Sequence, residues 1–205
     1  MIKRSSKKFI DTLLIKNPNW KVLDIGCGYS AHKNASIICD IQDLSSYYKS
    51  KKFVKLNSKI LPFQNNEFDF VISSHVIEHV EDVSFFIQEL QRVATKGYIE
   101  LPTILEDNLV FENKKDHIWH MEFDDDNNQL IISKKIQFIE PVLTVSSAKN
   151  FSNYFRQSLV LELFWEKSIE YKIITKDILK LKKISRFTLF RKFFSKLLRN
   201  FFRKS

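Results

Sequence analysis

The chain has 205 residues, of which 44% are hydrophobic, and a formal net charge of +9. This length and composition predict one globular domain with a sizeable core and argue against a disordered chain. No apolar run approaches the ~20 residues needed to span a bilayer. Asp11 interrupts the N-terminal apolar run that a signal peptide would need, so we expect a cytoplasmic protein.

The positive charge lies near the C-terminus. Ten basic residues and no acidic residue follow Asp177, which leaves 23 basic and 24 acidic residues in 1–179. We therefore expect a nearly neutral domain over 1–179 and a basic segment over 180–205. The two cysteines, Cys27 and Cys39, form no C-x-x-C pair, and their spacing predicts buried thiols rather than a zinc site or a disulfide.

Strands and helices alternate in the first half of the chain. Ser5 or Ser6 can cap a first helix, which the pair Asn17-Pro18 ends. Apolar runs then predict four strands, at 20–25, 36–40, 52–56 and 68–73. The last of these runs is apolar enough to be buried on both faces, as strands of parallel sheets are.

A longer helix and a fifth strand follow. Asp82 can cap this helix, in which apolar residues recur at the spacing of one helical face up to Ala94. Gly97 fits the C′ position after the helix, and residues 98–101 read as a strand. The alternation predicts parallel pairing with right-handed crossovers, and hence an α/β, Rossmann-like three-layer sandwich with a mostly parallel sheet.

The pattern changes in the second half of the chain. Residues 117–123 and 129–134 read as two strands around a polar turn, which predicts an antiparallel hairpin toward the C-terminal side. Residues 159–164 and 169–174 predict a second hairpin, which turns at 166–168.

The stretch from residue 22 to residue 30 reads V-L-D-I-G-C-G-Y-S, so that a short apolar strand runs into a glycine-rich turn. Gly26 and Gly28 let the backbone approach a ligand, although an ordinary strand-to-loop turn explains this stretch taken alone. Asp40 ends the second strand on the same edge, where its carboxylate can accept both hydroxyls of a ribose. It follows Gly28 by only twelve residues, against ~20 in dinucleotide folds, so an adenosine without phosphates fits better than a pyrophosphate.

Four blocks within residues 20–102 carry a family resemblance. They are V-L-D-I-G-C-G, then Asp40, then L-P-F-Q-N-N-E-F-D-F-V-I-S-S-H-V-I-E-H-V-E-D, then E-L-Q-R-V-A-T-K-G-Y-I-E-L-P. In this order the blocks resemble a class I S-adenosylmethionine-dependent methyltransferase, most closely the small bacterial domains of the type-11 group. The resemblance implies S-adenosylmethionine as the cofactor and a cofactor-binding core over 20–102.

The resemblance also implies roles for individual positions. Asp24 would face the methionine part of the cofactor, Asp40 would bind the ribose, and Asn57 would lie near the adenine amine, where the family usually has an acidic residue. We expect this asparagine to weaken cofactor binding without abolishing it. The implied cofactor-binding residues are Asp24, Gly26, Gly28, Asp40, Ile41, Asn57, Ser58, Leu61, Ser74 and His75.

A hydroxyl or amine acceptor gains from a base that removes its proton, and histidine is the usual base. His75, Glu78 and His79 have the spacing i, i+3, i+4, so they would share one face of a helical turn. With His117 they are the candidate catalytic residues, and we assign no metal. Their spacing is also H-x-x-E-H, the inverted zinc-protease pattern, but here it follows a buried strand instead of lying within a helix.

Two alternatives remain for this motif. Glu78, His79 and the distant His117 could hold a divalent metal, as in families with an E-x-x-E-H version of the motif, although His75 stands where those families have a glutamate. Alternatively, Glu78 and His79 form a hydrogen-bonded structural pair. Trp119 and Trp165 could line an acceptor pocket or belong to the core.

The C-terminal segment 180–205 combines aromatic and basic residues. Phenylalanines and leucines recur every three to four residues from Phe187 to Phe201, with cations between them. This pattern is typical of a basic amphipathic helix that lies on an anionic membrane surface. Packing on the protein's own flank, contact with a second subunit, and RNA binding are the alternatives.

Together these patterns predict a cytoplasmic methyltransferase, peripheral at the inner face of the membrane. The acceptor is a hydroxyl of a small or lipid-linked sugar molecule, and residues 115–175 form the acceptor side of the domain. The alternatives are a metal-assisted RNA 2′-O-methyltransferase and an inactive methyltransferase-fold binding module. Nucleic acid is the less favoured partner.

Overall fold

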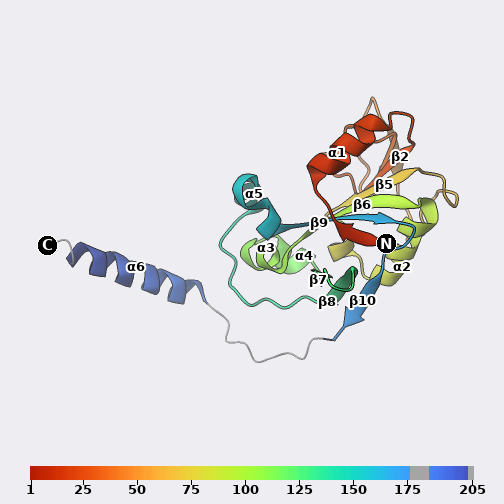
Figure 1. Cartoon of the computed structure of the whole chain (residues 1–205). Helices are drawn as coiled ribbons and strands as arrows, with labels where there is room; N and C mark the ends of the chain where they lie inside the picture. The colour runs from red at the N-terminus through yellow and green to blue at the C-terminus, as the bar shows by residue number, and fades with distance from the viewer. Residues whose placement is uncertain (176–184, 203–205) are drawn as a thin grey trace.

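The computed structural model describes residues 1–175 and 185–202, and it contains two β-sheets with helices around them (Figure 1). The main sheet has seven strands in the order β1-β9-β6-β5-β2-β3-β4. Their bounds are Ile2–Arg4 (β1), Val22–Ile25 (β2), Ile37–Asp40 (β3), Lys52–Lys55 (β4), Phe70–Ser74 (β5), Lys96–Pro102 (β6) and Val160–Glu166 (β9).

Parallel pairing dominates this sheet. Strand β2 pairs in parallel with β3 and β5, β3 with β4, and β5 with β6, whereas β9 is antiparallel to both β6 and β1. The carboxyl ends of the parallel strands therefore lie along one edge of the sheet. The predicted fold class, α/β with a mostly parallel sheet, is confirmed.

Six α-helices and one 3-10 helix accompany the sheets in the described residues. Their bounds are Lys7–Lys16 (α1), Ile77–His79 (η1), Val83–Val93 (α2), Ile104–Leu109 (α3), Asn113–Asp116 (α4), Val145–Leu159 (α5) and Arg186–Phe202 (α6). The two predicted helix caps are present, since the Ser6 hydroxyl accepts from the Phe9 amide at 3.2 Å and Asp82 Oδ1 accepts from the Phe85 amide at 3.0 Å.

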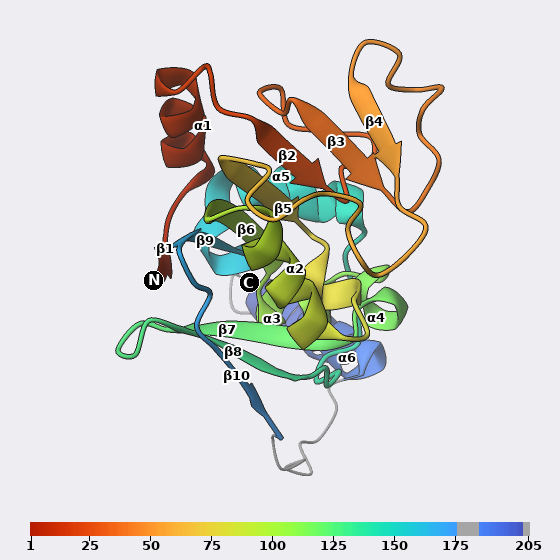
Figure 2. The ribbon, with the colours of Figure 1, turned by 90° about the vertical axis from the view of Figure 1, so that its right-hand side faces the viewer.

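The main sheet is buried on both faces, because α1 and α2 cover opposite sides of it (Figure 2). Alternate residues of a strand point to opposite faces, so Phe70 packs with α1 and Val71 packs with α2. Apolar residues of the smaller sheet join the core between the main sheet and α2. Cys27 and Cys39 are buried and free, as their spacing predicted.

The smaller sheet has three strands in the order β10-β8-β7. Trp119–Asp124 (β7) and Gln129–Lys134 (β8) form the predicted antiparallel hairpin, and Tyr171–Ile174 (β10) pairs in parallel with β8. Trp119 and Trp165 are both buried in the main core, which answers the question that the sequence left open for them.

The predicted second hairpin is wrong. Its turn exists, with a bridge between Glu166 and Ser168, but its two strands belong to different sheets. Strand β9 is buried on both faces and lies between β1 and β6. An apolar strand of this kind is more stable inside the main sheet than in a two-stranded hairpin with one solvated face.

Gly97 is not at the C′ position of α2, because the helix ends at Val93 with Ala94 as its C-cap, and Gly97 lies inside β6. A Cβ atom on Gly97 would lie 2.5 Å from the Val71 carbonyl oxygen and 2.7 Å from Nε1 of Trp165. Close packing between strands therefore explains this glycine.

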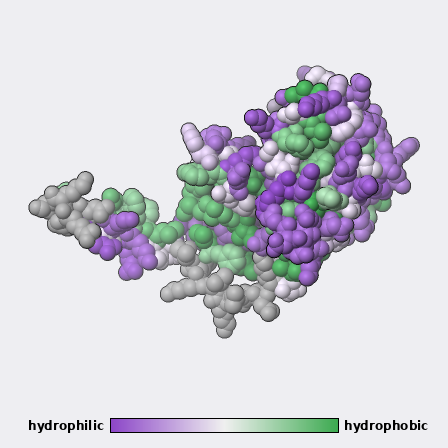
Figure 3. Space-filling view, viewed as in Figure 1, coloured by the Kyte–Doolittle hydropathy of each residue, from purple (hydrophilic) through white to green (hydrophobic). Residues whose placement is uncertain are grey.

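The C-terminal helix α6 lies apart from the sheets, on the side of the molecule where α3 and α5 lie (Figure 1). Apolar and hydrophilic atoms occupy different sides of it (Figure 3). Within the described residues, no helix has the length and apolar character that a membrane crossing requires. The predicted cations Lys180, Lys182, Lys183, Arg203 and Lys204 lie outside the described residues.

The packing at Gly97 predicts the outcome of a pair of substitutions. Gly97→Ala should lower the free energy of unfolding by about 3 kcal/mol, because the added methyl group collides with a strand backbone. Gly28→Ala should cost only about 1 kcal/mol, since Gly28 has φ of +47° but open space around it. Urea denaturation of both variants measures the difference, and equal losses would contradict this account of Gly97.

Candidate functional site

The glycine turn after β2 has left-handed backbone at both glycines, with φ of 65° at Gly26 and 47° at Gly28. A Cβ atom on Gly26 would collide with the side chain of Val76, whereas nothing lies within 4 Å of the Cβ position on Gly28. The first glycine is therefore needed for packing against the loop after β5. The second leaves open space over the turn.

Asp40, at the end of β3, holds this turn in place. Its Oδ2 accepts from the Gly28 amide at 2.9 Å, and its Oδ1 accepts from the Gln42 amide at 2.9 Å. A carboxylate has about four lone-pair positions, so each oxygen retains capacity for one more donor. Asp40 can therefore anchor the turn and bind ribose hydroxyls at the same time.

Tyr48 braces the turn from the other side, a role that we did not predict. Its hydroxyl donates to the Gly28 carbonyl at 2.7 Å and accepts from the Ala31 amide at 3.0 Å. The signal in the sequence is weak, because Tyr47 and Tyr48 form an aromatic pair inside an otherwise polar segment.

Asp24 is a buried carboxylate beside the turn. Its Oδ2 accepts from the His32 amide at 2.7 Å, but burial outweighs this bond and raises the pKa of Asp24 to about 6. A positively charged ligand group would favour the ionised form of Asp24 and so would be attracted here.

Two adjoining cavities follow the carboxyl edge of the sheet. The first, of about 810 Å³, is lined by seven of the ten predicted cofactor residues: Gly26, Asp40, Ile41, Asn57, Ser58, Leu61 and His75. The second, of about 890 Å³, is lined by the other three, Asp24, Gly28 and Ser74, and again by Gly26 and His75. The two cavities share Gly26, His75 and His79, so the structure brings all ten residues together at this edge of the sheet.

A half-buried ion pair on α2 holds the L-P-F segment in the wall of the first cavity. Glu89 accepts from the Leu61 amide at 2.7 Å, and the Arg92 guanidinium donates to the Leu61 carbonyl at 3.0 Å and to the Phe63 carbonyl at 2.7 Å. Arg92 also donates to Glu89 at 2.6 Å. This pairing on α2 fixes the wall of the cavity.

The predicted catalytic residues meet where the two cavities join. His75 has a strained left-handed backbone, with φ of 55°, and its Nδ1 lies 3.2 Å from Glu78 Oε1. His79 and His117 come from distant parts of the chain, yet their rings lie 4.5 Å apart and perpendicular. Glu78 therefore pairs with His75 and not with His79, contrary to the structural-pair alternative.

His75 is also linked to Glu100 on β6. Its Nε2 lies 3.4 Å from Glu100 Oε1. Burial works against the charged imidazole, but the hydrogen bonds to Glu100 and Glu78 raise the pKa of His75 to about 10. Burial likewise disfavours the ionised Glu100, and the bonds from His75 and Arg156 overcome it and lower the pKa of Glu100 to about 2.

Glu100 and Arg156 line the second cavity, and we did not predict them. Arg156 on α5 donates to Glu100 Oε2 at 2.8 Å, and the Tyr98 hydroxyl lies 2.8 Å from the same oxygen. Single glutamates inside the apolar runs I-E-L-P and V-L-E-L-F are the signal that could have found this network, because a charge in a buried strand requires partners.

Known proteins and protein families are similar to this chain. Residues 23–99 match the family model of the methyltransferase domain. The chain is 30% identical over 155 residues to the uncharacterised protein MJ0638 of Methanocaldococcus jannaschii, covering 67% of this chain and 68% of that protein. This chain carries a class I methyltransferase domain.

Solved structures are more distant from this methyltransferase. The PH0226 protein of Pyrococcus horikoshii OT3 is 15% identical, with 80% of this chain and 93% of that chain covered and a TM-score of 0.45. An S-adenosylmethionine-dependent methyltransferase of Mesorhizobium loti is 17% identical, with 44% and 50% covered and a TM-score of 0.37. This chain therefore spans about half of the Mesorhizobium enzyme.

The cofactor of this methyltransferase is S-adenosylmethionine, and the residues of the site fit it. Gly28 leaves open space over the turn, and Asp40 and Asn57 supply acceptors in the first cavity, where Ile41 and Leu61 supply apolar surface. The buried acid Asp24 lines the second cavity, which suits the positive methionine end of the cofactor.

The raised pKa of Asp24 predicts a pH dependence of cofactor binding. In the free protein this carboxyl takes up a proton as pH falls through about 6, whereas the amino group of a bound ligand favours the ionised form. The affinity for S-adenosylhomocysteine should therefore be roughly tenfold lower at pH 5 than at pH 7.5. Calorimetric titrations at the two pH values measure this ratio.

Two variants serve to assign the effect. Asp24→Asn has no proton to take up and should lose most of the pH dependence. Asp43→Asn, which alters an exposed carboxyl that accepts from the Ser45 amide and hydroxyl, should retain it. The same ratio in Asp24→Asn and in the unmodified protein would show that another group titrates.

Proposed function

We propose that this protein transfers a methyl group from S-adenosylmethionine to a hydroxyl of a small or lipid-linked acceptor at an anionic membrane surface. The observation that carries the proposal is the pair of joined cavities at the carboxyl edge of the sheet. The first contains the residues expected to bind the adenosine, and the second has room and polar groups for a second molecule. Residues 1–179 would form the methyltransferase domain and 180–205 its membrane-binding segment.

The lining of the second cavity supports a polar acceptor group. The cavity is lined by carboxylates, which can accept hydrogen bonds from hydroxyls, and by cations, which can bind an anionic group. The carboxylates are Glu106, Glu112 and Asp116, and the cations are Lys7, Lys149 and Arg156. A sugar, alone or joined to a phosphate, carries both kinds of group. The acceptor region, expected over 115–175, would extend back to residue 103, because Glu106 and Glu112 line this cavity. It would exclude β9, which belongs to the main sheet.

Bound S-adenosylmethionine supplies a methyl group that is already activated on a sulfonium sulfur. The protein then has to hold the acceptor oxygen in line with that methyl group and remove water from the site. His75 and His79 line both cavities, His117 lines the second, and the buried Glu78 bonds His75. We propose that these four residues position the acceptor hydroxyl and handle its proton.

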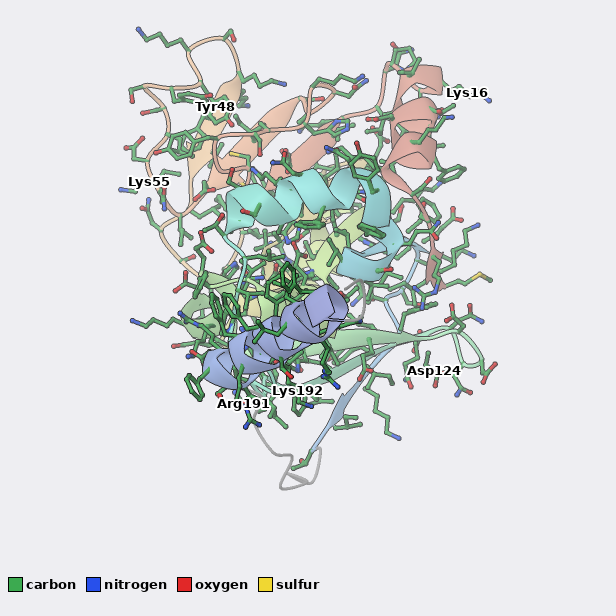
Figure 4. All side chains as sticks on the ribbon, turned by 90° about the vertical axis from the view of Figure 1, so that its left-hand side faces the viewer. Lys16, Tyr48, Lys55, Asp124, Arg191 and Lys192 are labelled. Carbon is green, nitrogen blue, oxygen red and sulfur yellow. The ribbon has the colours of Figure 1, made fainter. Side chains whose placement is uncertain are left out.

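The exposed surface beside the second cavity supports a lipid-linked acceptor. Helix α5 contributes Lys149, Ser152 and Arg156 to the cavity, and it exposes three aromatic side chains to solvent: Phe151, Tyr154 and Phe155. Helix α6 lies on the same side of the molecule, in front of the sheets in Figure 4. A membrane that contacts both helices would lie next to the cavity.

Helix α6 has the composition that a membrane surface requires. Its exposed apolar side chains are Phe187, Leu189, Phe190, Phe193, Phe194, Leu197, Leu198 and Phe201. It contains no acidic residue, and five cations are spread along it, of which Arg191 and Lys192 are labelled in Figure 4. Its apolar face binds the acyl boundary and its cations bind anionic headgroups.

A substitution of Asp40, the residue proposed to bind the ribose, tests cofactor binding. Asp40→Ala leaves the ribose hydroxyls unpaired and should weaken S-adenosylhomocysteine binding by roughly 10- to 100-fold, which corresponds to about 1.5–3 kcal/mol. Asp43→Ala, three residues further along, should bind normally. Calorimetry on the full chain measures both, and no heat from the unmodified protein would overturn the proposed function.

Membrane binding is tested by flotation of the full chain with vesicles. The protein should float with vesicles that contain anionic lipid and remain behind with zwitterionic ones. Replacing Lys192, Lys196 and Arg199 with Gln should lower the partition coefficient roughly 100-fold, since each cation contributes about 1 kcal/mol. Thr188→Ala is the matched control on the same helix.

Two results would contradict the membrane assignment. One is equal flotation of the unmodified and triply substituted chains. The other is a gel shift with RNA that the same three substitutions abolish, which would make nucleic acid the partner of α6.

A further inference from the structure

We infer that Glu78, His79 and His117 form a binding site for one divalent transition-metal ion at the junction of the two cavities. One ligand atom from each residue lies within 4.8 Å of the other two. Two imidazole nitrogens and one carboxylate oxygen are donors that suit Mn²⁺, Co²⁺ or Zn²⁺ and leave further coordination positions open.

The carboxylate of Glu78 is prepared for a cation. Its side chain is 1% exposed, and Oε1 faces His75 Nδ1 at 3.2 Å. Its Oε2 is buried and has no hydrogen-bond partner among the residues that the structure describes. A buried acceptor without a partner is costly, and a metal ion at Oε2 would remove that cost.

Both histidines have their Nδ1 atoms occupied. His79 Nδ1 lies 2.9 Å from the Asp116 carbonyl oxygen, and His117 Nδ1 lies 2.5 Å from Asp107 Oδ1. An acceptor at Nδ1 keeps the proton on that nitrogen, so Nε2 presents its lone pair. Metal-binding histidines are oriented by bonds of this kind, from a carbonyl or a carboxylate behind the ring.

The backbone joins the two segments that carry these ligands. The Ile118 amide donates to the Glu78 carbonyl at 2.8 Å, and the Trp119 indole donates to the Val80 carbonyl at 2.8 Å. These two bonds hold the segment before β7 against η1. His117 is therefore kept close to Glu78 and His79. Ligand atoms on one metal ion lie roughly 3–3.5 Å apart, so the three side chains would move closer together when the ion binds.

The position of the triad indicates what the metal would do. His79 lines both cavities and His117 lines the second, so an open coordination position faces the space beside the predicted cofactor. A hydroxyl bound to a divalent metal loses its proton more readily, and its oxygen is held in place. This role of the metal rests on the proposed function, whereas the metal site itself does not.

The test uses the full chain after treatment with a chelator, and Co²⁺ as the probe. Calorimetry should show one Co²⁺ per chain, with the visible absorption of a nitrogen- and oxygen-ligated ion. Glu78→Gln and His117→Gln should each weaken binding by about 100-fold or more, and Asp107→Asn by roughly 10- to 100-fold. His32→Gln and Glu81→Gln, an imidazole and a carboxylate outside the triad, should bind Co²⁺ normally.

Thermal unfolding separates a metal site from a structural role. Co²⁺ should raise the melting temperature of the unmodified chain and not that of Glu78→Gln. Without metal, Glu78→Gln should be less stable than the unmodified chain, because the charged His75 imidazole loses one of its two carboxylate partners. Weak or non-stoichiometric Co²⁺ binding by the unmodified chain, or an equal rise in the melting temperature of Glu78→Gln with Co²⁺, would overturn the inference.

The two proposals fail independently. Co²⁺ binding is measured without S-adenosylhomocysteine, and S-adenosylhomocysteine binding is measured in the presence of chelator. Cofactor binding without Co²⁺ binding would leave the methyltransferase function and remove the metal site. Co²⁺ binding without cofactor binding would do the reverse.

Discussion

Parallel pairing of β2 with its neighbours β3 and β5 is the constraint on which the site depends. It aligns the carboxyl ends of the three strands, so that the glycine turn, Asp40 and His75 become neighbours. The Gly26 amide donates to the Cys39 carbonyl at 2.8 Å, and the Gly28 amide donates to the Asp40 carboxylate. The residue expected to bind ribose is therefore also an anchor of the fold, and cofactor affinity and local stability are coupled through it.

Much of the fold could be predicted because local patterns and long-range packing agree there. The apolar runs before Gly26 and Asp40 are buried strands, and Ser6 and Asp82 cap helices as their side chains favour. The cofactor residues could be proposed because they follow successive strands that meet at one edge. Whether they bind the cofactor remains a prediction.

The elements that sequence patterns missed depend on distant partners. Strand β1 has only three residues and is stabilised by pairing with β9, far away in the chain. The local sequence of β9 does not distinguish it from a hairpin strand. Its place in the main sheet is determined by pairing with the apolar edge of β6. The approach of His117 to His79 is likewise set by the bonds between η1 and β7, which no spacing in the sequence reveals.

The cofactor, acceptor and metal proposals all involve charged side chains at the carboxyl edge of the main sheet. Arg156 and His75 offset Glu100, whereas Glu78 retains one oxygen without a partner in the described part of the chain. A buried oxygen without a hydrogen-bond partner is more typical of a functional site than of a structural core. These side chains lie near the cavity that contains the predicted adenosine residues and the cavity that α5 lines.

A crystal structure of the full chain with S-adenosylhomocysteine tests the central claim most directly. The account predicts ribose hydroxyls within hydrogen-bond distance of the Asp40 carboxylate, adenine between Ile41 and Leu61, and the methionine end beside Asp24. Ligand density at another place, or the ribose turned away from Asp40, would contradict it.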